Sequence, residues 1–163
     1  MKNNAEAQYN LGVMYSNGKG VKQDYLKAKE LYEKAAAQGY ALAQYNLGVF
    51  YANGEGVKQD YFKAKEWYEK AAAQGDALAQ YNLGLMYYHG EGVKQDFKKA
   101  KEWFEKAAAQ GYALAQYNLG VMYSNGKGVK QDYFKAKEWF GKACDGGEQM
   151  GCDNYKKLNQ QGY

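Results

Sequence analysis

A segment of 36 residues repeats four times along this chain, almost letter for letter. The stretch AEAQYNLG at Ala5–Gly12 returns as ALAQYNLG at residues 41–48, 77–84 and 113–120. A fixed period of this size is typical of a stacked repeat array, in which each unit buries its apolar face against its neighbours. We therefore expect one repeat domain over residues 1–163, with units at 5–40, 41–76, 77–112 and 113–148 and a cap at 149–163.

Each unit is predicted to form two antiparallel helices. In the second unit, apolar residues spaced four apart predict a first helix over about residues 41–52, and the loop NGEGV follows. Asp60 is suited to accept hydrogen bonds from the first free N–H groups of a second helix, and Gly75 is suited to end that helix as a left-handed cap. The predicted fold class is an all-α solenoid of about nine helices, four pairs plus a C-terminal capping helix.

A glycine stands in the middle of each first helix, at Gly12, Gly48, Gly84 and Gly120. Glycine in a helix interior costs about 1 kcal/mol relative to alanine. We therefore expect a neighbouring helix to pass each glycine too closely for a β-carbon, in close backbone contact. The stripe of aromatic residues and alanines on the second helices is assigned to the core, and we expect no cofactor.

The charge pattern indicates solvated helix faces. The net charge is +4, and all 22 basic residues are lysines that alternate with glutamates. Pairs such as Lys29 and Glu33 have the i,i+4 spacing of surface ion pairs. A nucleic-acid partner would require basic residues gathered in one patch. No apolar run approaches the roughly 20 residues of a membrane span, and no signal-peptide leader stands before Ala5. We expect a monomer that neither binds nucleic acid nor inserts into a membrane.

The repeat carries a recognisable pattern of residues. It reads A-x-A-x-x-x-L-G-x-x-Y at Ala41–Tyr51, G-x-G-V at Gly54–Val57, D-Y-x-K-A at Asp60–Ala64 and W-Y-x-K-A-A-x-x-G at Trp67–Gly75. This pattern resembles the Sel1-like repeat family, a relative of the tetratricopeptide repeats, over about residues 5–161. The resemblance implies right-handed superhelices of antiparallel helix pairs that act as adaptors and scaffolds.

Both cysteines stand near the C-terminal end of the sequence. Cys144 and Cys152 are separated by seven residues, with Gly146 and Gly147 making the turn between the two helices expected there. This placement permits a disulfide if the Cα atoms lie within about 7 Å, and free buried thiols are the alternative. A zinc site is disfavoured because His89, the single histidine, lies far away in sequence. The segment KACDGGEQMGC also resembles the cysteine-rich secreted proteins of Helicobacter, whose C-x7-C pairs form disulfides. A disulfide would imply an oxidising compartment, secreted or periplasmic.

The residue inventory argues against catalysis. The chain has one histidine, two serines and no threonine, and Ser16 and Ser124 lie in different units from His89. The motif S-x-x-K, found in β-lactamases, occurs at Ser16 and again at Ser124. A lactamase places that serine at a helix N-terminus and adds S-D-N and K-T-G elements, whereas here the serine is predicted to end a helix. We expect no enzyme, no catalytic residues and no metal.

One face of the first helices is the predicted binding site. Residues at i, i+4, i+7 or i+8, and i+11 share a face, and in related families this helix lines the concave side of the array. An asparagine ladder there can pair with a peptide backbone, and methionine and phenylalanine can hold side chains. The predicted groove consists of Leu42, Asn46, Phe50, Asn53, Leu78, Asn82, Met86, His89, Leu114, Asn118, Met122 and Asn125.

Three functions of different classes remain open from the sequence. A protein- or peptide-binding scaffold is the favoured interpretation, with a partner of unknown identity. An idealised or consensus array without an evolved ligand is the main alternative, because the repeats are unusually alike and lack proline, arginine, isoleucine and threonine. A β-lactam-binding or β-lactam-hydrolysing protein is the third, by family resemblance alone.

Overall fold

The computed structural model describes residues 4–163, and these residues form helices and loops without a strand. The described residues contain nine α-helices: α1 Ala5–Asn17, α2 Tyr25–Ala37, α3 Ala41–Asn53, α4 Tyr61–Ala73, α5 Ala77–His89, α6 Phe97–Ala109, α7 Ala113–Asn125, α8 Tyr133–Asp145 and α9 Gln149–Gln160. The predicted fold class, four helix pairs and a C-terminal helix, is confirmed. We call the odd-numbered helices A helices and the even-numbered helices B helices.

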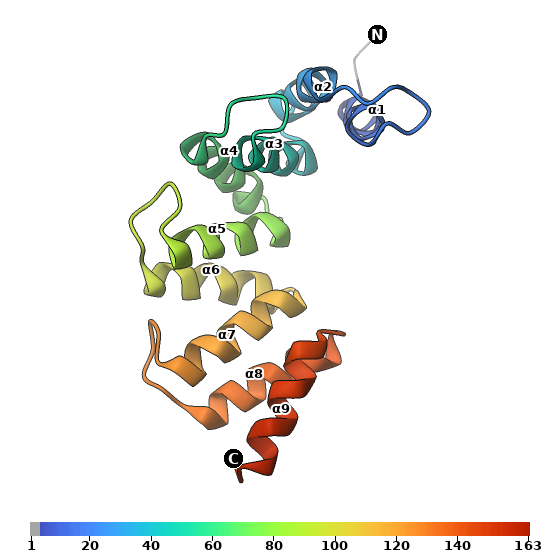
Figure 1. Ribbon diagram of the computed structural model, residues 1–163. Helices are drawn as coiled ribbons and strands as arrows, with labels where there is room; N and C mark the ends of the chain where they lie inside the picture. The colour runs from blue at the N-terminus through green and yellow to red at the C-terminus, as the bar shows by residue number, and fades with distance from the viewer. Residues whose placement is uncertain (1–3) are drawn as a thin grey trace. The chain divides into compact units, whose positions relative to one another are not determined.

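The helices, which are labelled in Figure 1, belong to two compact units. The first unit contains α1–α4 and ends at Ala79, within the first turn of α5. The second unit runs from Gln80 to Tyr163 and contains the rest of α5 with α6–α9. Within each unit, helices that are neighbours in sequence also pack against each other. Thus α3 contacts α4 of its own repeat and α2 of the adjacent one, and α7 likewise contacts α8 and α6.

Helix ends form where the sequence provides caps. The Asp60 carboxylate accepts a hydrogen bond from the Lys63 backbone N–H at 3.1 Å and so begins α4. Such a cap stabilises a helix by about 1 kcal/mol. At the other end of α4, Gly75 follows the last helical turn with a φ of +90°, which favours glycine. Both predictions for this helix are confirmed.

The mid-helix glycines lie directly under aromatic rings. A β-carbon built on Gly48 would lie 2.5 Å from the Tyr68 ring, and one on Gly84 would lie 2.5 Å from the Phe104 ring. The predicted close contact is confirmed, but its partner differs from the prediction. Each glycine faces first an aromatic side chain of the B helix in its own repeat, and at Gly12 the backbone carbonyl of Ala28 also lies 3.4 Å from the added β-carbon. The remaining repeats show the same contact, between Gly12 and Tyr32 and between Gly120 and Phe140.

Buried residues of a B helix and the following A helix form the core between repeats. In the first unit, the Tyr32 ring of α2 meets the Phe50 ring of α3 edge to face, with centroids 5.3 Å apart. Leu47 is fully buried beside them. Small residues let the two helices approach closely and complete this cluster: Ala28, Ala35, Ala36 and Ala43.

A buried glutamine ties α3 to α2, and another ties α7 to α6. Gln44 donates from Nε2 to the Ala36 carbonyl at 3.4 Å, and its Oε1 accepts from Gln74 Nε2 at 2.8 Å. Gln116 makes the equivalent donation to the Ala108 carbonyl at 3.2 Å. Its Oε1, however, is buried without a partner among the described residues. The reason is that Gly146 stands where the other repeats have glutamine, so no side-chain amide reaches this oxygen.

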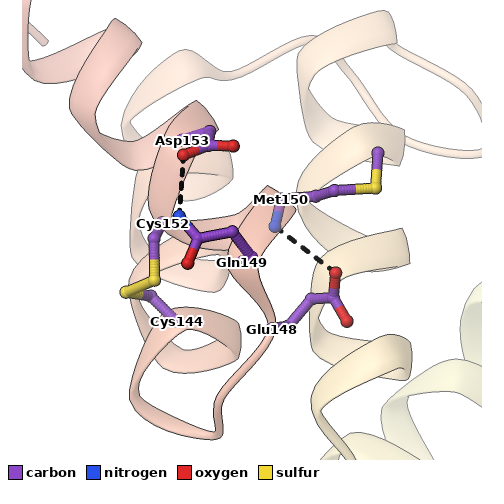
Figure 2. The surroundings of a disulfide bond; sticks show 6 residues. All are labelled: Cys144, Glu148, Gln149, Met150, Cys152 and Asp153. Carbon is purple, nitrogen blue, oxygen red and sulfur yellow. Dashed lines mark hydrogen bonds between the residues drawn. A yellow bond between two sulfur atoms is a disulfide. The ribbon is translucent and has the colours of Figure 1, made fainter.

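A disulfide joins the last two helices (Figure 2). Cys144 on α8 and Cys152 on α9 are bonded, with their Cα atoms 4.5 Å apart. The predicted pairing is confirmed. A shift of 36 residues aligns these two positions with Ala108 and Gln116, the pair that is hydrogen-bonded in the preceding repeat. The covalent bond between α8 and α9 therefore stands in place of the glutamine tie.

The glycine contact can be tested with Gly84→Ala. A methyl group on Gly84 would overlap the buried Phe104 ring, and overpacking of this kind costs about 1–3 kcal/mol. We expect a lower free energy of unfolding by circular dichroism in urea, although alanine is the better helix former. The control is Gly141→Ala in α8, where the new methyl group meets only the half-exposed Tyr155 ring at 3.3 Å. A Gly84→Ala protein as stable as the Gly141→Ala protein would contradict the contact.

The disulfide can be tested with the double substitution Cys144→Ala and Cys152→Ala. The chain-entropy model gives a loss of about 2–3 kcal/mol for a closed loop of this length. Because repeat arrays are stabilised mainly by neighbouring contacts, we expect α9 to lose protection in hydrogen exchange before the other helices. Uniform loss of protection over residues 80–163 would show instead that the bond stabilises the whole unit.

Candidate functional site: clefts between successive A helices

A cleft of about 220 Å³ lies between the A helices α5 and α7. Leu85 and Val121 contribute apolar side chains, and Asn118 contributes an amide. Tyr88, His89 and Tyr117 complete the lining. All six residues belong to the second unit, and all come from A helices.

A second cleft, of about 360 Å³, lies between α7 and α9. Its positions repeat those of the first cleft 36 residues later, since Asn154 corresponds to Asn118 and Lys157 corresponds to Val121. Val121 lines both clefts, so the two are adjacent. The lining consists of Val121, Ser124, Asn125, Tyr133, Phe140, Asn154, Lys157, Leu158 and Gln161.

Tyr88, in the wall of the first cleft, is held by aromatic and cationic neighbours. Its ring meets the Phe97 ring edge to face at 5.1 Å, and the His89 ring lies at the same centroid distance. The Lys127 ammonium lies over Tyr88, 5.5 Å from the ring centroid. Contacts of this type fix a ring without burying it completely. The cleft therefore has one aromatic wall of defined orientation.

Asn118 is oriented by a tyrosine of the preceding A helix. Its amide donates a hydrogen bond to the Tyr81 phenol oxygen. Burial raises the pKa of the Tyr81 phenol above its ordinary value, and the bond from Asn118 acts in the opposite direction. An asparagine amide has two donors and a carbonyl acceptor, so this bond leaves further capacity on the cleft side.

The equivalent positions of the first unit are satisfied internally. The Tyr32 hydroxyl is hydrogen-bonded to the side chains of both Asn46 and Ser16. Burial raises the pKa of the Tyr32 phenol, and these two bonds partly oppose that shift. In the fourth repeat, Phe140 stands at the position of Tyr32 and has no hydroxyl to offer. In the first unit a B-helix tyrosine therefore pairs the polar groups between two A helices, whereas Asn118, for which Phe104 stands at the corresponding position, pairs with Tyr81 of an A helix.

Comparison with known proteins agrees with the repeat boundaries seen in the sequence. The Sel1 repeat model matches residues 5–40, 41–76, 77–112 and 113–148. These four segments cover most of the chain. The chain belongs to the Sel1 repeat family.

Solved structures support this membership. A protective antigen of uropathogenic Escherichia coli, which displays an SLR fold, aligns with a TM-score of 0.95 and 43% identity over 98% of this chain. A Sel1 repeat protein from Oxalobacter formigenes aligns with a TM-score of 0.92 and 35% identity over 95% of it. This chain spans 34% of the E. coli chain and 63% of the Oxalobacter chain. No curated protein sequence matches it.

A cysteine-rich relative also has this fold. Helicobacter pylori cysteine-rich protein B aligns with a TM-score of 0.64 and 26% identity, covering 83% of this chain and 98% of its own. The sequence resemblance to the cysteine-rich proteins of Helicobacter is thus accompanied by a similar structure. In this Sel1 repeat chain, the two cysteines pair at the last repeat.

Three predicted groove residues do not lie in the groove. Phe50, Met86 and Met122 are core residues, with exposed fractions of 3%, 4% and 0%. They follow Val49, Leu85 and Val121 by one residue, which is a rotation of about 100° around the helix. That rotation turns them from the A-helix face into the packing between repeats, and Leu85 and Val121 line the clefts instead.

Two asparagines of the predicted ladder are already hydrogen-bonded within the protein. Asn46, Asn82 and Asn118 are half-buried, and Asn46 and Asn118 are hydrogen-bonded to tyrosines of neighbouring helices. Asn46 and Asn118 therefore have structural bonds, and their pairing with a peptide backbone stays a prediction. Asn118 lines a cleft nonetheless, in addition to its structural bond.

The other predicted groove residues lie at the ends of the A helices. Asn53, His89 and Asn125 are exposed in the last turns, and the latter two line clefts. Leu42, Leu78 and Leu114 are exposed in the first turns, by 40%, 36% and 38%, outside the two clefts described above.

Sequence reasoning missed several cleft residues. They are Tyr88, Tyr117, Ser124, Tyr133, Phe140, Asn154, Lys157, Leu158 and Gln161. Extending the 36-residue shift from Asn118 into the last helix leads directly to Asn154, so the signal for that residue was available.

No metal or membrane site is indicated for residues 4–163. Within this part of the chain, no three histidine, cysteine or acidic side chains gather as metal ligands. No described helix has both the length and the apolar character that a membrane crossing requires.

The bond between Asn118 and Tyr81 can be tested with Asn118→Ala. Loss of one such hydrogen bond typically costs about 0.5–1.5 kcal/mol, and we expect that decrease in the free energy of unfolding. We also expect the pKa of Tyr81 to rise further, because the bond from Asn118 lowers it. The control is Asn125→Ala on the same helix, an exposed position where a change within about 0.5 kcal/mol is expected. Equal stability of the two variants would contradict the structural role of Asn118.

Proposed function

We propose that this Sel1 repeat scaffold binds extended segments of partner proteins on the A-helix face of residues 80–163. The observation that supports this proposal is the pair of adjacent clefts that share Val121 and recur at the repeat period. A peptide that places side chains in both clefts would follow the direction in which the A helices succeed one another.

The size of the clefts favours side chains over small-molecule ligands. Pockets for drug-sized ligands usually measure about 300–1,000 Å³ and enclose most of the ligand. The cleft between α5 and α7 is smaller than this range, and that between α7 and α9 lies near its lower end. Two small clefts with apolar walls and amide edges suit one side chain each, with the amides of Asn118 and Asn154 available to backbone groups.

We propose that the protein binds partners and does not act as an enzyme. Ser16 and Ser124 stand in the last turns of α1 and α7, whereas the S-x-x-K serine of β-lactamases begins a helix. The Ser16 side chain is also hydrogen-bonded to the Tyr32 hydroxyl. We therefore expect no turnover of the chromogenic β-lactam nitrocefin by the purified protein.

We also propose an oxidising location, secreted or periplasmic. The support is the bond between Cys144 and Cys152, because structural disulfides form and persist mainly in such compartments. Partners would then be proteins of the cell envelope or of the surroundings of the cell.

Peptide selection tests the proposed function directly. The immobilised protein is offered a displayed library of random ten-residue peptides, and the enriched sequences are compared with those from Val121→Phe. The larger side chain would fill space in both clefts, so we expect the enriched peptides to bind this variant at least about tenfold more weakly.

The control variant is Phe62→Lys. Phe62 is 73% exposed on α4, and the third repeat already has Lys98 at this position. We expect peptide binding to be unchanged by this substitution. Enriched peptides that bind Val121→Phe as well as the parent protein, with both folded by circular dichroism, would exclude the A-helix clefts as the binding site.

A further inference from the structure

We infer that the cleft between α7 and α9 is an acid-binding subsite, which binds the carboxylate of an aspartate or glutamate side chain of the bound peptide. The inference rests on the proposed function and adds the chemistry of the partner. The inference is based on two differences from the adjacent cleft: this cleft contains a positive charge, and its side-chain hydrogen-bond donors can still bind a ligand.

The first observation is the charge of Lys157. The corresponding A-helix residues in the repeats are valine or leucine: Val13, Val49, Leu85 and Val121. In α9 this position is a lysine, and its side chain lines the cleft. Among residues 4–163, no carboxylate pairs with Lys157. Asp153, one turn earlier, accepts a hydrogen bond from Gln149 at 2.9 Å (Figure 2).

The second observation is the set of donors around Lys157. Ser124, Asn125, Asn154 and Gln161 also line the cleft, and each can donate a hydrogen bond. No aspartate or glutamate belongs to the lining. One cation and four neutral donors, without an anion, complement a carboxylate, because hydrogen bonds to a charged acceptor are about twice as strong as those between neutral groups.

The third observation is the phenylalanine in the lining of this cleft. In the first unit, the Tyr32 hydroxyl binds both Asn46 and Ser16. Their equivalents in the cleft are Asn154 and Ser124, and the aromatic residue beside them is Phe140. Because phenylalanine lacks the hydroxyl, it cannot satisfy these two groups as Tyr32 does. Their hydrogen bonds remain available to a ligand.

The cleft between α5 and α7 indicates which kind of residue should accompany the acidic residue in the bound peptide. Leu85, Tyr117 and Val121 give that cleft an apolar lining. A peptide that spans both clefts would therefore carry an apolar side chain on one side of Val121 and an acidic side chain on the other. We expect this pair of residues at a fixed spacing in peptides selected by the protein.

Selections on two variants test this inference. The displayed ten-residue library is selected against the parent protein, Lys157→Val and Phe140→Tyr. Both substitutions introduce residues that other repeats already have at these positions, so the fold is expected to persist. We expect the parent protein to enrich an acidic residue at a fixed distance from an apolar one. Lys157→Val should keep the apolar preference and lose the acidic one.

Binding of one enriched peptide provides the quantitative test. Loss of a hydrogen bond to a charged group corresponds to about 10–100-fold in affinity, and we expect a weakening of that order when the acidic residue is changed to its amide. In Lys157→Val the same peptide change should have little effect. Phe140→Tyr should also weaken binding, because its new hydroxyl can pair with Asn154 and Ser124 as Tyr32 does in the first repeat.

Several results would overturn the inference while leaving the proposed function intact. They are a consensus without an acidic residue, an acidic preference that persists in Lys157→Val, and binding that depends on the free C-terminal carboxylate of the peptide rather than on its side chain. The last result is recognised by comparing the peptide with its C-terminal amide. A selection that yields no consensus would overturn the proposed function, and the acid-binding subsite with it.

Discussion

The contact between a glycine and an aromatic ring sets the geometry of each repeat. At Gly48 and Gly84 a β-carbon would come within 2.5 Å of the ring opposite, so the B helix can lie this close only because the A helix has no side chain there. The ring fills the space between the two helices and reaches the next repeat, as Tyr32 does when it meets Phe50. Packing within a repeat and packing between repeats therefore depend on the same aromatic residue.

This dependence links the core to the binding surface. A tyrosine at the ring position extends a hydroxyl toward the polar groups between two A helices, and Tyr32 pairs with Asn46 and Ser16 in this way. A phenylalanine packs on its glycine equally well, since Phe104 and Phe140 make the same contact. The difference of one oxygen atom has little influence on the fold but changes the partners of the polar groups, since Asn46 pairs with Tyr32 and Asn118, where the ring is Phe104, pairs with Tyr81. A nearly invariant scaffold can thus present different surfaces from one repeat to the next.

The sequence predicts the fold because its signals are local and occur four times. Caps such as Asp60 and left-handed glycines such as Gly75 act within a few residues, and the period aligns them. The binding face is harder to predict, because neighbouring positions on a helix differ by only one residue. Val121 and Met122 are both apolar, and nothing in their chemistry shows which lines a cleft and which is buried. Asn118 was predicted as a groove residue, but its bond to Tyr81 could not be predicted, because it depends on the distance between two A helices, which no single repeat encodes.

In the last repeat of this chain, a disulfide stands where the preceding repeats have a glutamine tie. In the internal repeats a glutamine such as Gln44 holds the B helix on one side and a second glutamine on the other. At the C-terminal side, Gly146 removes the second glutamine and leaves Gln116 Oε1 without a partner among the described residues. Such a group costs about 1–3 kcal/mol. The disulfide between Cys144 and Cys152, at the positions of the other tie (Ala108 and Gln116 in the preceding repeat), supplies a stabilisation of similar size and holds α9 in place. Because α9 also carries Asn154 and Lys157, this bond positions the polar groups of the cleft between α7 and α9.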